Sequence, residues 1–254
     1  MYTHPVPRPA DLAPRHAVAN QGDLLGPLGI ALGDPSANPV EMPLDPDADA
    51  RVMRALAGAG FTTAHTLIAI HVSAGNAFRR WPQAAFVALV VGLARRDPAL
   101  RFLLTSGPSD ADAARAIVNE VATELGPGSR VVAHGQFEVD ELRALAARAS
   151  VYIGGDSGPL HIAAATQTPI VALFGPTLPE RSMPWRDARW FAEAVDAGPL
   201  PCRPCRQRAC APGDFRCLTG IDPERVIGAT ERALLARAAH AERHDVERPR
   251  VLRA

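Results

Sequence analysis

The sequence contains no lysine. All 27 of its basic side chains are arginines, and 27 acidic side chains balance them to a net charge of zero. This balance gives no sign of a nucleic-acid-binding surface or of a polybasic membrane surface. We attribute the missing lysine, together with the many alanines and the 24 prolines, to compositional bias of the genome. Any cation that binds phosphate here must therefore be an arginine or a histidine.

Long apolar runs are absent as well. No run reaches the roughly 18 residues that a membrane-spanning helix needs. Residues 1–9 lack the charged-then-apolar pattern of a signal peptide, so we expect a cytoplasmic protein. Cysteine is scarce, and its four copies all lie between Cys202 and Cys217. In a reducing compartment such a cluster indicates metal ligands or free thiols before disulfides.

Short apolar runs alternate with helical patterns from residue 67 onward. This alternation is typical of a parallel sheet whose right-handed crossovers are helices. The sequence therefore predicts an α/β fold, a Rossmann-like parallel sheet with flanking helices. Strands are expected at 67–72, 101–105, 130–134, 151–153 and 169–174, with a weaker sixth at 189–192. Helices are expected at 47–59, 83–96, 138–149 and 222–239. Two more are expected, one that follows the loop 106–110 and ends at about 125, and one that begins at 159.

Three parts of the chain differ in composition. Residues 1–66 begin with a stretch rich in proline and aspartate, and they predict a linker or the remnant of an N-terminal domain. Residues 67–240 form the predicted Rossmann-like domain, which includes a cysteine-rich loop at 202–217. Residues 241–254 are charged and predict a disordered tail.

The segment 151–165 carries the clearest local signal for a ligand. A β-branched and aromatic run ends at Gly154-Gly155, and Asp156-Ser-Gly-Pro159 then leads into a helix. The start of a helix exposes backbone N–H groups and a positive dipole end, which suit a phosphate. The structural alternative is that Asp156 and Ser157 only cap the helix.

Other polar segments end at the same edge of the predicted sheet. In open parallel sheets the ligand binds outside the carboxyl ends of the strands. The segments expected there are rich in Gly, Ser, Thr, Arg and Asp, so they converge on a site for a small molecule. They are 73–80, 106–110, 135–137, 154–161 and 175–177.

Taken together, these segments resemble the lipopolysaccharide heptosyltransferase family, glycosyltransferase family 9. The resemblance spans Leu67 to Leu235 and rests on the order and spacing of motifs that are weak one by one. They are His71-x-Ser-Ala-Gly75, Arg79-Arg-Trp-Pro82, Thr105-Ser-Gly-Pro108, Gly155–Ala165, Ala172–Thr177 and the cysteine cluster.

The resemblance implies a GT-B enzyme, in which two Rossmann-like domains face each other across a cleft. The C-terminal domain binds the nucleotide sugar, typically ADP-heptose, and the N-terminal domain binds the acceptor, the growing lipopolysaccharide core. This chain resembles the C-terminal, donor-binding half. No cofactor is expected for the chemistry. Because the acceptor is a membrane lipid, peripheral contact with the inner face of the inner membrane is compatible with this family.

The sequence departs from the family in its N-terminal part. An acceptor domain should add roughly 150 residues, and only residues 1–66 precede the first predicted strand. The family's catalytic carboxylate lies near the start of that domain, in a glycine-rich strand without a counterpart here, so the catalytic base is expected outside this chain. We expect a truncated or split gene product, with the N-terminal domain encoded separately, or a naturally single donor domain.

The resemblance also implies roles for individual residues. Arg79 or Arg80 would neutralise charge on the departing nucleoside diphosphate, and spacing does not say which of the two does so. The residues implied in donor binding are Ser73, Ala74, Asp110, Phe137, Asp156, Ser157, Gly158, His161 and Thr177.

Structural roles compete with several of these assignments. Asp110 and Thr177 are also suited to capping, and His161 to a place on the helix surface or in the core. Core packing is an alternative for Phe137 and the favoured role for Trp81.

The four cysteines Cys202, Cys205, Cys210 and Cys217 lie close enough in sequence to close a tetrahedral zinc or iron–sulfur site. Similar clusters recur in the family, where no catalytic role is implied. We expect a structural staple for a long loop, with zinc as the favoured ligand and free thiols or disulfides as the alternatives.

Three functions remain in competition. The leading hypothesis is transfer of a heptose from ADP-heptose to the lipopolysaccharide core, with this chain supplying the donor-binding domain. The alternatives are a non-catalytic nucleotide-sugar-binding module and a GT-B-like enzyme with a different nucleotide sugar.

Overall fold

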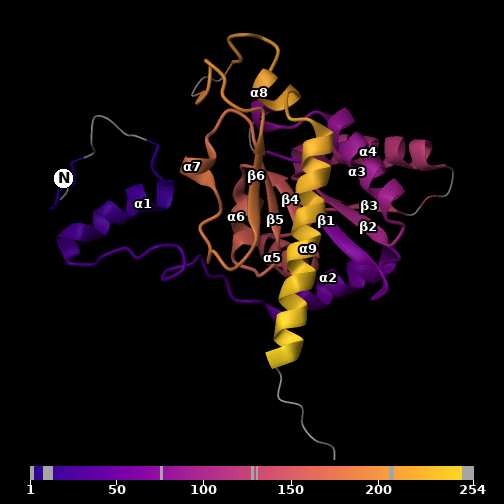
Figure 1. Ribbon diagram of the computed structural model, residues 1–254, viewed down its shortest axis with the longest axis horizontal. Helices are drawn as coiled ribbons and strands as arrows, with labels where there is room; N and C mark the ends of the chain where they lie inside the picture. Colours follow the sequence, from indigo (N-terminus) through magenta and orange to yellow (C-terminus); the bar gives the residue numbers. More distant parts are fainter. Residues whose placement is uncertain are drawn as a thin grey trace, which may run out of the picture.

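The computed structural model describes residues 3–7, 14–74, 77–126, 129, 131–205 and 209–247. Within this part of the chain, six parallel strands form one sheet in the order β3-β2-β1-β4-β5-β6 (Figure 1). The predicted α/β fold is therefore confirmed. The strands are β1 Thr66–His71, β2 Leu100–Thr105, β3 Val132–Gly135, β4 Val151–Gly155, β5 Ile170–Phe174 and β6 Ala192–Asp196.

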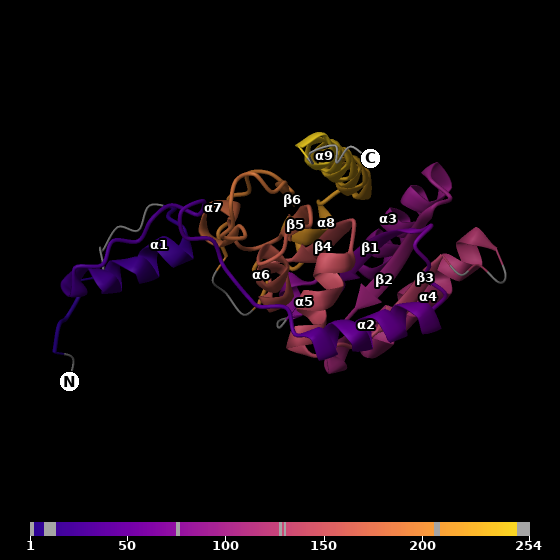
Figure 2. The ribbon, with the colours of Figure 1, turned by 90° about the horizontal axis from the view of Figure 1, so that it is seen from below.

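Helices cover both faces of the sheet, which explains why the central strands are apolar throughout (Figure 2). In β1, Ile68 and Ile70 pack into one buried cluster, while Leu67 and Ala69 pack into the other. The first cluster includes side chains of α3 Gln83–Arg96, α4 Ala111–Leu125 and α9 Pro223–Glu247. The second includes side chains of α2 Pro46–Gly58, α5 Val139–Arg148 and α6 Gly158–Ala164. Each fully buried Ile or Leu contributes about 1.5–3 kcal/mol of transfer free energy.

The N-terminal segment lies along the outside of this domain. Its helices α1 Ala17–Gly22 and η1 Asp23–Leu28 contain no buried residue. In both ribbon views α1 stands away from the sheet, beyond α7 Pro179–Ser182 (Figures 1 and 2). Hydrogen bonds from backbone and side chains hold the segment to the loop after α7. The amide of Val40 donates to the carbonyl of Trp185 at 3.1 Å, and the amide of Ala188 to the hydroxyl of Ser36 at 3.3 Å. His16 Nε2 lies 2.7 Å from the carbonyl of Met183, and Trp185 Nε1 donates to the carbonyl of Asn38 at 2.7 Å.

Four short helices complete the described residues. They are η2 Ala77–Arg79, η3 Pro108–Asp110, α7 and α8 Arg216–Thr219. Among the described ranges, no helix is both long and apolar enough to cross a membrane.

Two predicted elements differ from the structure by more than two residues at an end. The sixth strand begins at Ala192 instead of spanning 189–192, because Asp187 organises a turn there: its carboxylate accepts from the amide of Arg189, and its carbonyl from the amide of Trp190. Helix α9 continues to Glu247 through an alanine-rich stretch of high helix propensity. Residues 241–247, expected in a disordered tail, are therefore helical, and 248–254 lie outside the described residues.

Candidate functional site

The strand order reverses direction between β1 and β4. From β1 the chain continues to β2 and β3 on one side, and from β4 to β5 and β6 on the other. His71 at the end of β1 is in register with Gly154 of β4, so the loops after these strands lie side by side. The crevice outside this reversal is where open α/β sheets bind their ligands.

Asp156 follows β4 directly and is the centre of a polar cluster at this point. Its side chain is only 10% exposed. Its Oδ2 atom accepts a hydrogen bond of 2.7 Å from the hydroxyl of Thr177, and Arg79 Nη1 lies 3.7 Å from the same oxygen. His161 Nε2 lies 3.8 Å from Oδ1. The structure thus brings together four of the predicted site residues from three loops and the first turns of α6.

The cluster keeps the carboxylate of Asp156 ionised. Burial by itself raises the pKa of this group. The imidazole of His161, the hydroxyl of Thr177 and the charge of Arg79 outweigh that effect and hold the pKa of Asp156 below its ordinary value. Arg79 is half exposed, so one side of its guanidinium remains open to solvent.

The start of α6 lies beside this cluster. Ser157 occupies the N-cap position, but its side chain makes no capping bond and donates to the carbonyl of Gly155 at 3.2 Å. Ser157 therefore stands where a cap was predicted, at the start of α6, but its side chain does not cap the helix. A Cβ atom added at Gly158 would meet nothing within 4 Å, so the surface above this turn is open.

Arg80 belongs to a separate group of contacts at the same edge. Its Nη1 lies 2.7 Å from Oδ1 of the buried Asp110, and its Nε donates to the carbonyl of Ala74 at 3.4 Å. Asp110 stands at the N-cap of α4 but makes no side-chain capping bond. The hydroxyl of Ser73 accepts from the amide of Gly107 at 2.9 Å. The two adjacent arginines thus serve different carboxylates, and Arg79 is the one beside Asp156.

Two aromatic residues have packing roles. Trp81 is buried, donates from Nε1 to the carbonyl of Ile221 at 3.1 Å and packs edge-on against Phe86 at 4.9 Å. This confirms core packing for Trp81. The ring of Phe137 packs against the cluster beneath α2 and α5 and covers Gly135, where a Cβ would lie 2.5 Å from Cε2. The contacts of Phe137 favour its structural alternative.

Sequence analysis missed a buried ion pair that supports the cluster. The side chain of Arg203 is only 4% exposed and lies 2.6 Å from Oδ2 of Asp196 at the end of β6. Arg203 Nη2 also donates to the carbonyl of Thr177 at 2.8 Å. The backbone of Thr177 is therefore fixed by Arg203, while its hydroxyl holds Asp156. Nothing in the sequence distinguishes this arginine from the others in the cysteine-rich loop.

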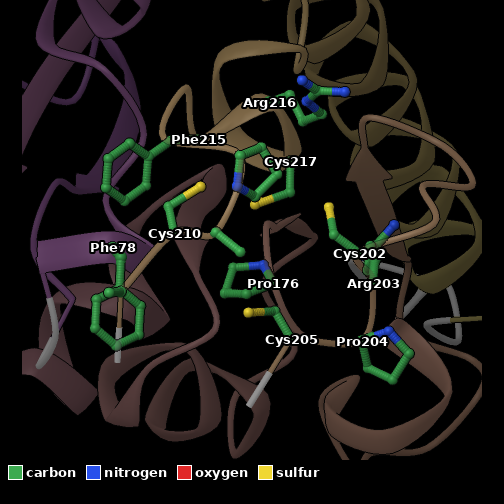
Figure 3. Close-up of a pocket in the computed structure, with 13 residues that line it drawn as sticks. Phe78, Pro176, Cys202, Arg203, Pro204, Cys205, Cys210, Phe215, Arg216 and Cys217 are labelled. Atoms are coloured by element: carbon green, nitrogen blue, oxygen red, sulfur yellow. The ribbon is translucent and has the colours of Figure 1, made fainter. Parts of the chain in front are cut away.

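The four cysteines line a cavity of about 510 Å³ that adjoins the cluster (Figure 3). The cavity wall includes Phe78 and Pro176, the chain neighbours of Arg79 and Thr177. None of the four thiols is in a disulfide. Burial raises the pKa of the Cys217 thiol, and the neighbouring cysteines add to the effect.

The described residues of the cysteine-rich loop show no metal-binding group. Among the described residues, no three His, Cys, Asp or Glu side chains gather closely enough to hold an ion. The structure therefore lends no support to the expected zinc site.

The strand order and the site at its reversal define an open, doubly wound α/β domain of the Rossmann type. Residues 8–214 match the family model described as Glycosyltransferase family 9 (heptosyltransferase), and the chain belongs to that family. The match begins at residue 8, so the similarity starts well before Leu67, where sequence analysis placed it.

Curated relatives and solved structures agree with this assignment. Lipopolysaccharide heptosyltransferase 3 of Escherichia coli is 33% identical over 233 residues, which are 92% of this chain and 63% of the relative. A crystal structure of the glycosyl transferase family 9 from Veillonella parvula DSM 2008 is 25% identical, with a TM-score of 0.68 over 87% of this chain and 60% of that one. The structure of E. coli ADP-heptose lps heptosyltransferase II shares the fold, with 19% identity and a TM-score of 0.60 over 78% of this chain and 54% of that one. The chain thus spans less than two thirds of the length of each.

Proposed function

We propose that this chain supplies the donor-binding domain of a heptosyltransferase, which moves a heptose from ADP-heptose to a hydroxyl of the lipopolysaccharide core. The observation that carries the proposal is the Asp156–Arg79–His161–Thr177 cluster at the reversal of strand order. Membership of glycosyltransferase family 9 supports the reaction class. The name of the E. coli structural neighbour supports ADP-heptose as the donor.

The chemistry assigns a role to each member of the cluster. In the transfer, the acceptor oxygen bonds to the anomeric carbon, the bond from that carbon to the diphosphate breaks, and ADP leaves with the bonding electrons. Arg79 would neutralise the charge that builds on the departing diphosphate. Asp156 would orient Arg79 and His161 toward the phosphates. The base that takes the acceptor's proton would come from the acceptor-binding side, outside the residues assigned here.

The assembled enzyme would act on a membrane lipid. We therefore expect it to work in the cytoplasm, in peripheral contact with the inner face of the inner membrane.

Calorimetric titration of the purified chain with ADP-heptose, ADP, UDP and GDP tests the donor site. We expect binding of the two adenine ligands only, weakened by about tenfold or more in Asp156→Asn because a charge-assisted contact is lost. Asp112→Asn, on the exposed side of α4, is the matched control and should bind like the parent chain. Failure of both adenine ligands to bind would refute the donor site, and preference for UDP or GDP would favour a GT-B-like enzyme with a different donor.

Turnover separates the enzyme from a binding module. Mixed with a separately produced acceptor-binding domain and core acceptor, the chain should release ADP from ADP-heptose. Donor binding without ADP release in that mixture would instead identify a non-catalytic nucleotide-sugar-binding module.

The cysteine-rich loop would act as a structural staple in this proposal, and transfer would need no metal. Metal analysis of protein purified without chelators tests zinc at the four thiols. We expect well under one equivalent of zinc, with all four thiols reactive toward a thiol reagent in the unfolded chain without prior reduction. One equivalent of zinc that protects the thiols would contradict this reading of the loop.

A further inference from the structure

A second cavity lies at the opposite edge of the sheet from the Asp156 cluster. It has a volume of about 820 Å³ and is bounded by the segment before β5, the turn before β6, the end of α5 and the last turns of α9. Its charged and aromatic lining residues are Arg143, Arg189, Trp190, Phe191, Arg237 and His240. Nothing in the proposed function uses this cavity.

The charged groups that line the cavity are cationic. Three arginines line it, of which Arg189 is paired with Asp187, and among the described residues no carboxylate is part of its wall. Two acidic residues lie near it, and each already has an arginine partner, which for Asp187 is Arg189 of the cavity wall itself. Asp187 pairs with Arg189 at 2.8 Å, and Asp49 pairs with Arg148 at 2.5 Å. The charge of Arg143 also acts on Asp49, but the two do not form an ion pair.

Arg143 and Arg237 have no ion-pair partner in the part of the chain that the structure describes. Arg143 Nε donates to the carbonyl of Met42 at 3.0 Å, and Arg237 Nη1 donates to the carbonyl of Ala149 at 2.8 Å. Each contact uses one of the five N–H groups of a guanidinium. Both side chains are partly buried. Burial lowers the pKa of Arg237, and no carboxylate offsets this. A desolvated cation without a counter-charge is unfavourable, and an anion in the cavity would relieve that cost.

The same cavity has an aromatic and apolar wall. The ring of Trp190 packs edge-on against His240 at 4.6 Å, and the guanidinium of Arg189 lies 5.5 Å from its centroid. Phe191, alanines of α5 and α9, and Ala165 directly after α6 are also part of the wall. A ligand that matches this surface would carry an apolar or planar group beside its negative charge.

We infer that this cavity binds a phosphate monoester that bears an apolar or aromatic group. A guanidinium donates two parallel hydrogen bonds to phosphate oxygens, and Arg143 and Arg237 would supply such donors from two different helices. The Trp190 side of the cavity would take the organic part of the ligand. The phosphate could belong to a soluble metabolite or to the headgroup of a lipid, since both present the same group.

Calorimetry with phenyl phosphate tests the inference on the full chain. The titrations use an Arg79→Gln background, because the Asp156 cluster is itself expected to bind phosphates. We expect a dissociation constant below about 1 mM for phenyl phosphate and weaker binding of inorganic phosphate or benzyl alcohol. Arg143→Gln and Arg237→Gln should each weaken the binding of phenyl phosphate by about tenfold or more. Arg54→Gln, on the exposed side of α2, is the matched control and should change nothing.

The two sources of phosphate are distinguished by vesicles. Sedimentation with phosphatidylcholine vesicles that contain phosphatidic acid, reversed by Arg237→Gln, would identify a lipid headgroup. Phenyl phosphate binding without sedimentation would identify a soluble monoester. The inference is overturned if phenyl phosphate does not bind in the Arg79→Gln background, or if Arg54→Gln weakens it as much as Arg143→Gln and Arg237→Gln do. If Arg237→Gln alone fails to fold, the Arg143→Gln result decides.

Discussion

The two edges of the sheet each contain a buried arginine, but the two arginines are compensated differently. At the carboxyl edge, where the strands end, Arg203 pairs with the carboxylate of Asp196 and also donates to the carbonyl of Thr177. At the amino edge, where the strands begin, Arg186 donates to the carbonyls of Thr166 and Thr168, at 2.8 and 2.9 Å, and has no ion-pair partner among the described residues. The charge of Asp187 offsets its burial only in part. Burial accordingly lowers the pKa of Arg186 to about 10.

At the carboxyl edge the arginines are matched by carboxylates, whereas at the amino edge arginines are in excess. Arg79, Arg80 and Arg203 all lie beside carboxylates at the carboxyl edge. Arg143 and Arg237 at the amino edge contact only backbone carbonyls among the described residues. A site made of paired charges is held in one geometry before a ligand arrives, whereas unpaired cations attract a ligand that supplies the missing charge.

Replacing Arg203 breaks the matched edge and should have the largest effect on stability. Arg203→Met removes the ion-pair partner of Asp196, which keeps the amide of Gly198 and the charge of Arg225, and it frees the backbone of Thr177. We expect a loss of about 3–5 kcal/mol in the free energy of unfolding. Urea denaturation measures this loss. Arg216→Met, in the same loop but exposed and paired with an exposed Asp214, should be close to the parent chain. Similar small losses in both variants would show that the Arg203–Asp196 pair does not anchor the loop.

Acid should lower the stability of the protein through His71, which lies at the carboxyl edge. Burial lowers the pKa of His71 from 6.5 to about 4, and its Nδ1 lies 2.8 Å from the hydroxyl of Thr105. Between these values the unfolded chain binds a proton that the folded chain does not, so stability falls as the pH decreases from 6.5 toward 4. Integrated over this window, the loss is about 3 kcal/mol.

Denaturant unfolding at a series of pH values measures this dependence. His71→Gln should flatten it, leaving a smaller slope of the same sign from His134, whose pKa burial also lowers. An unchanged slope in His71→Gln would mean that His71 is not the group that acid charges.

Replacing Arg186 should have the smallest effect of the three. Arg186→Met leaves no carboxylate unpaired and removes a cation whose burial is unfavourable, while two carbonyls lose their donors. We expect a net loss of about 1–2 kcal/mol in the same urea assay. A loss as large as that of Arg203→Met would show that the two edges do not differ in the way that their contacts indicate.

Much of the fold could be predicted because its signals are local. The apolar runs of β1, β2, β4 and β5 are buried on both faces, and the glycines and prolines that follow them mark the turns. Strand β6 was misplaced because its most apolar neighbours, Trp190 and Phe191, line the amino-edge cavity, whereas in the strand itself only Val195 is buried.

The partners of site residues were harder to predict, since they depend on contacts distant in sequence. Asp156 was placed correctly at the end of a strand, but its bond with Thr177 spans 21 residues. Spacing could not separate Arg79 from Arg80, which face different carboxylates. The ion pair of Arg203 with Asp196 needed the positions of β6 and of the cysteine-rich loop, neither of which a local pattern specifies.

The contact between Arg203 and Thr177 also links two regions thermodynamically. Arg203 joins the cysteine-rich loop to the residue whose hydroxyl holds Asp156. Coupling free energies between two sites are reciprocal. Whatever factor a modified loop imposes on the affinity for a ligand at Asp156, that ligand must impose on the equilibrium of the loop. We therefore expect the reactivity of the Cys202 and Cys205 thiols to change when a ligand binds at a site that they do not touch.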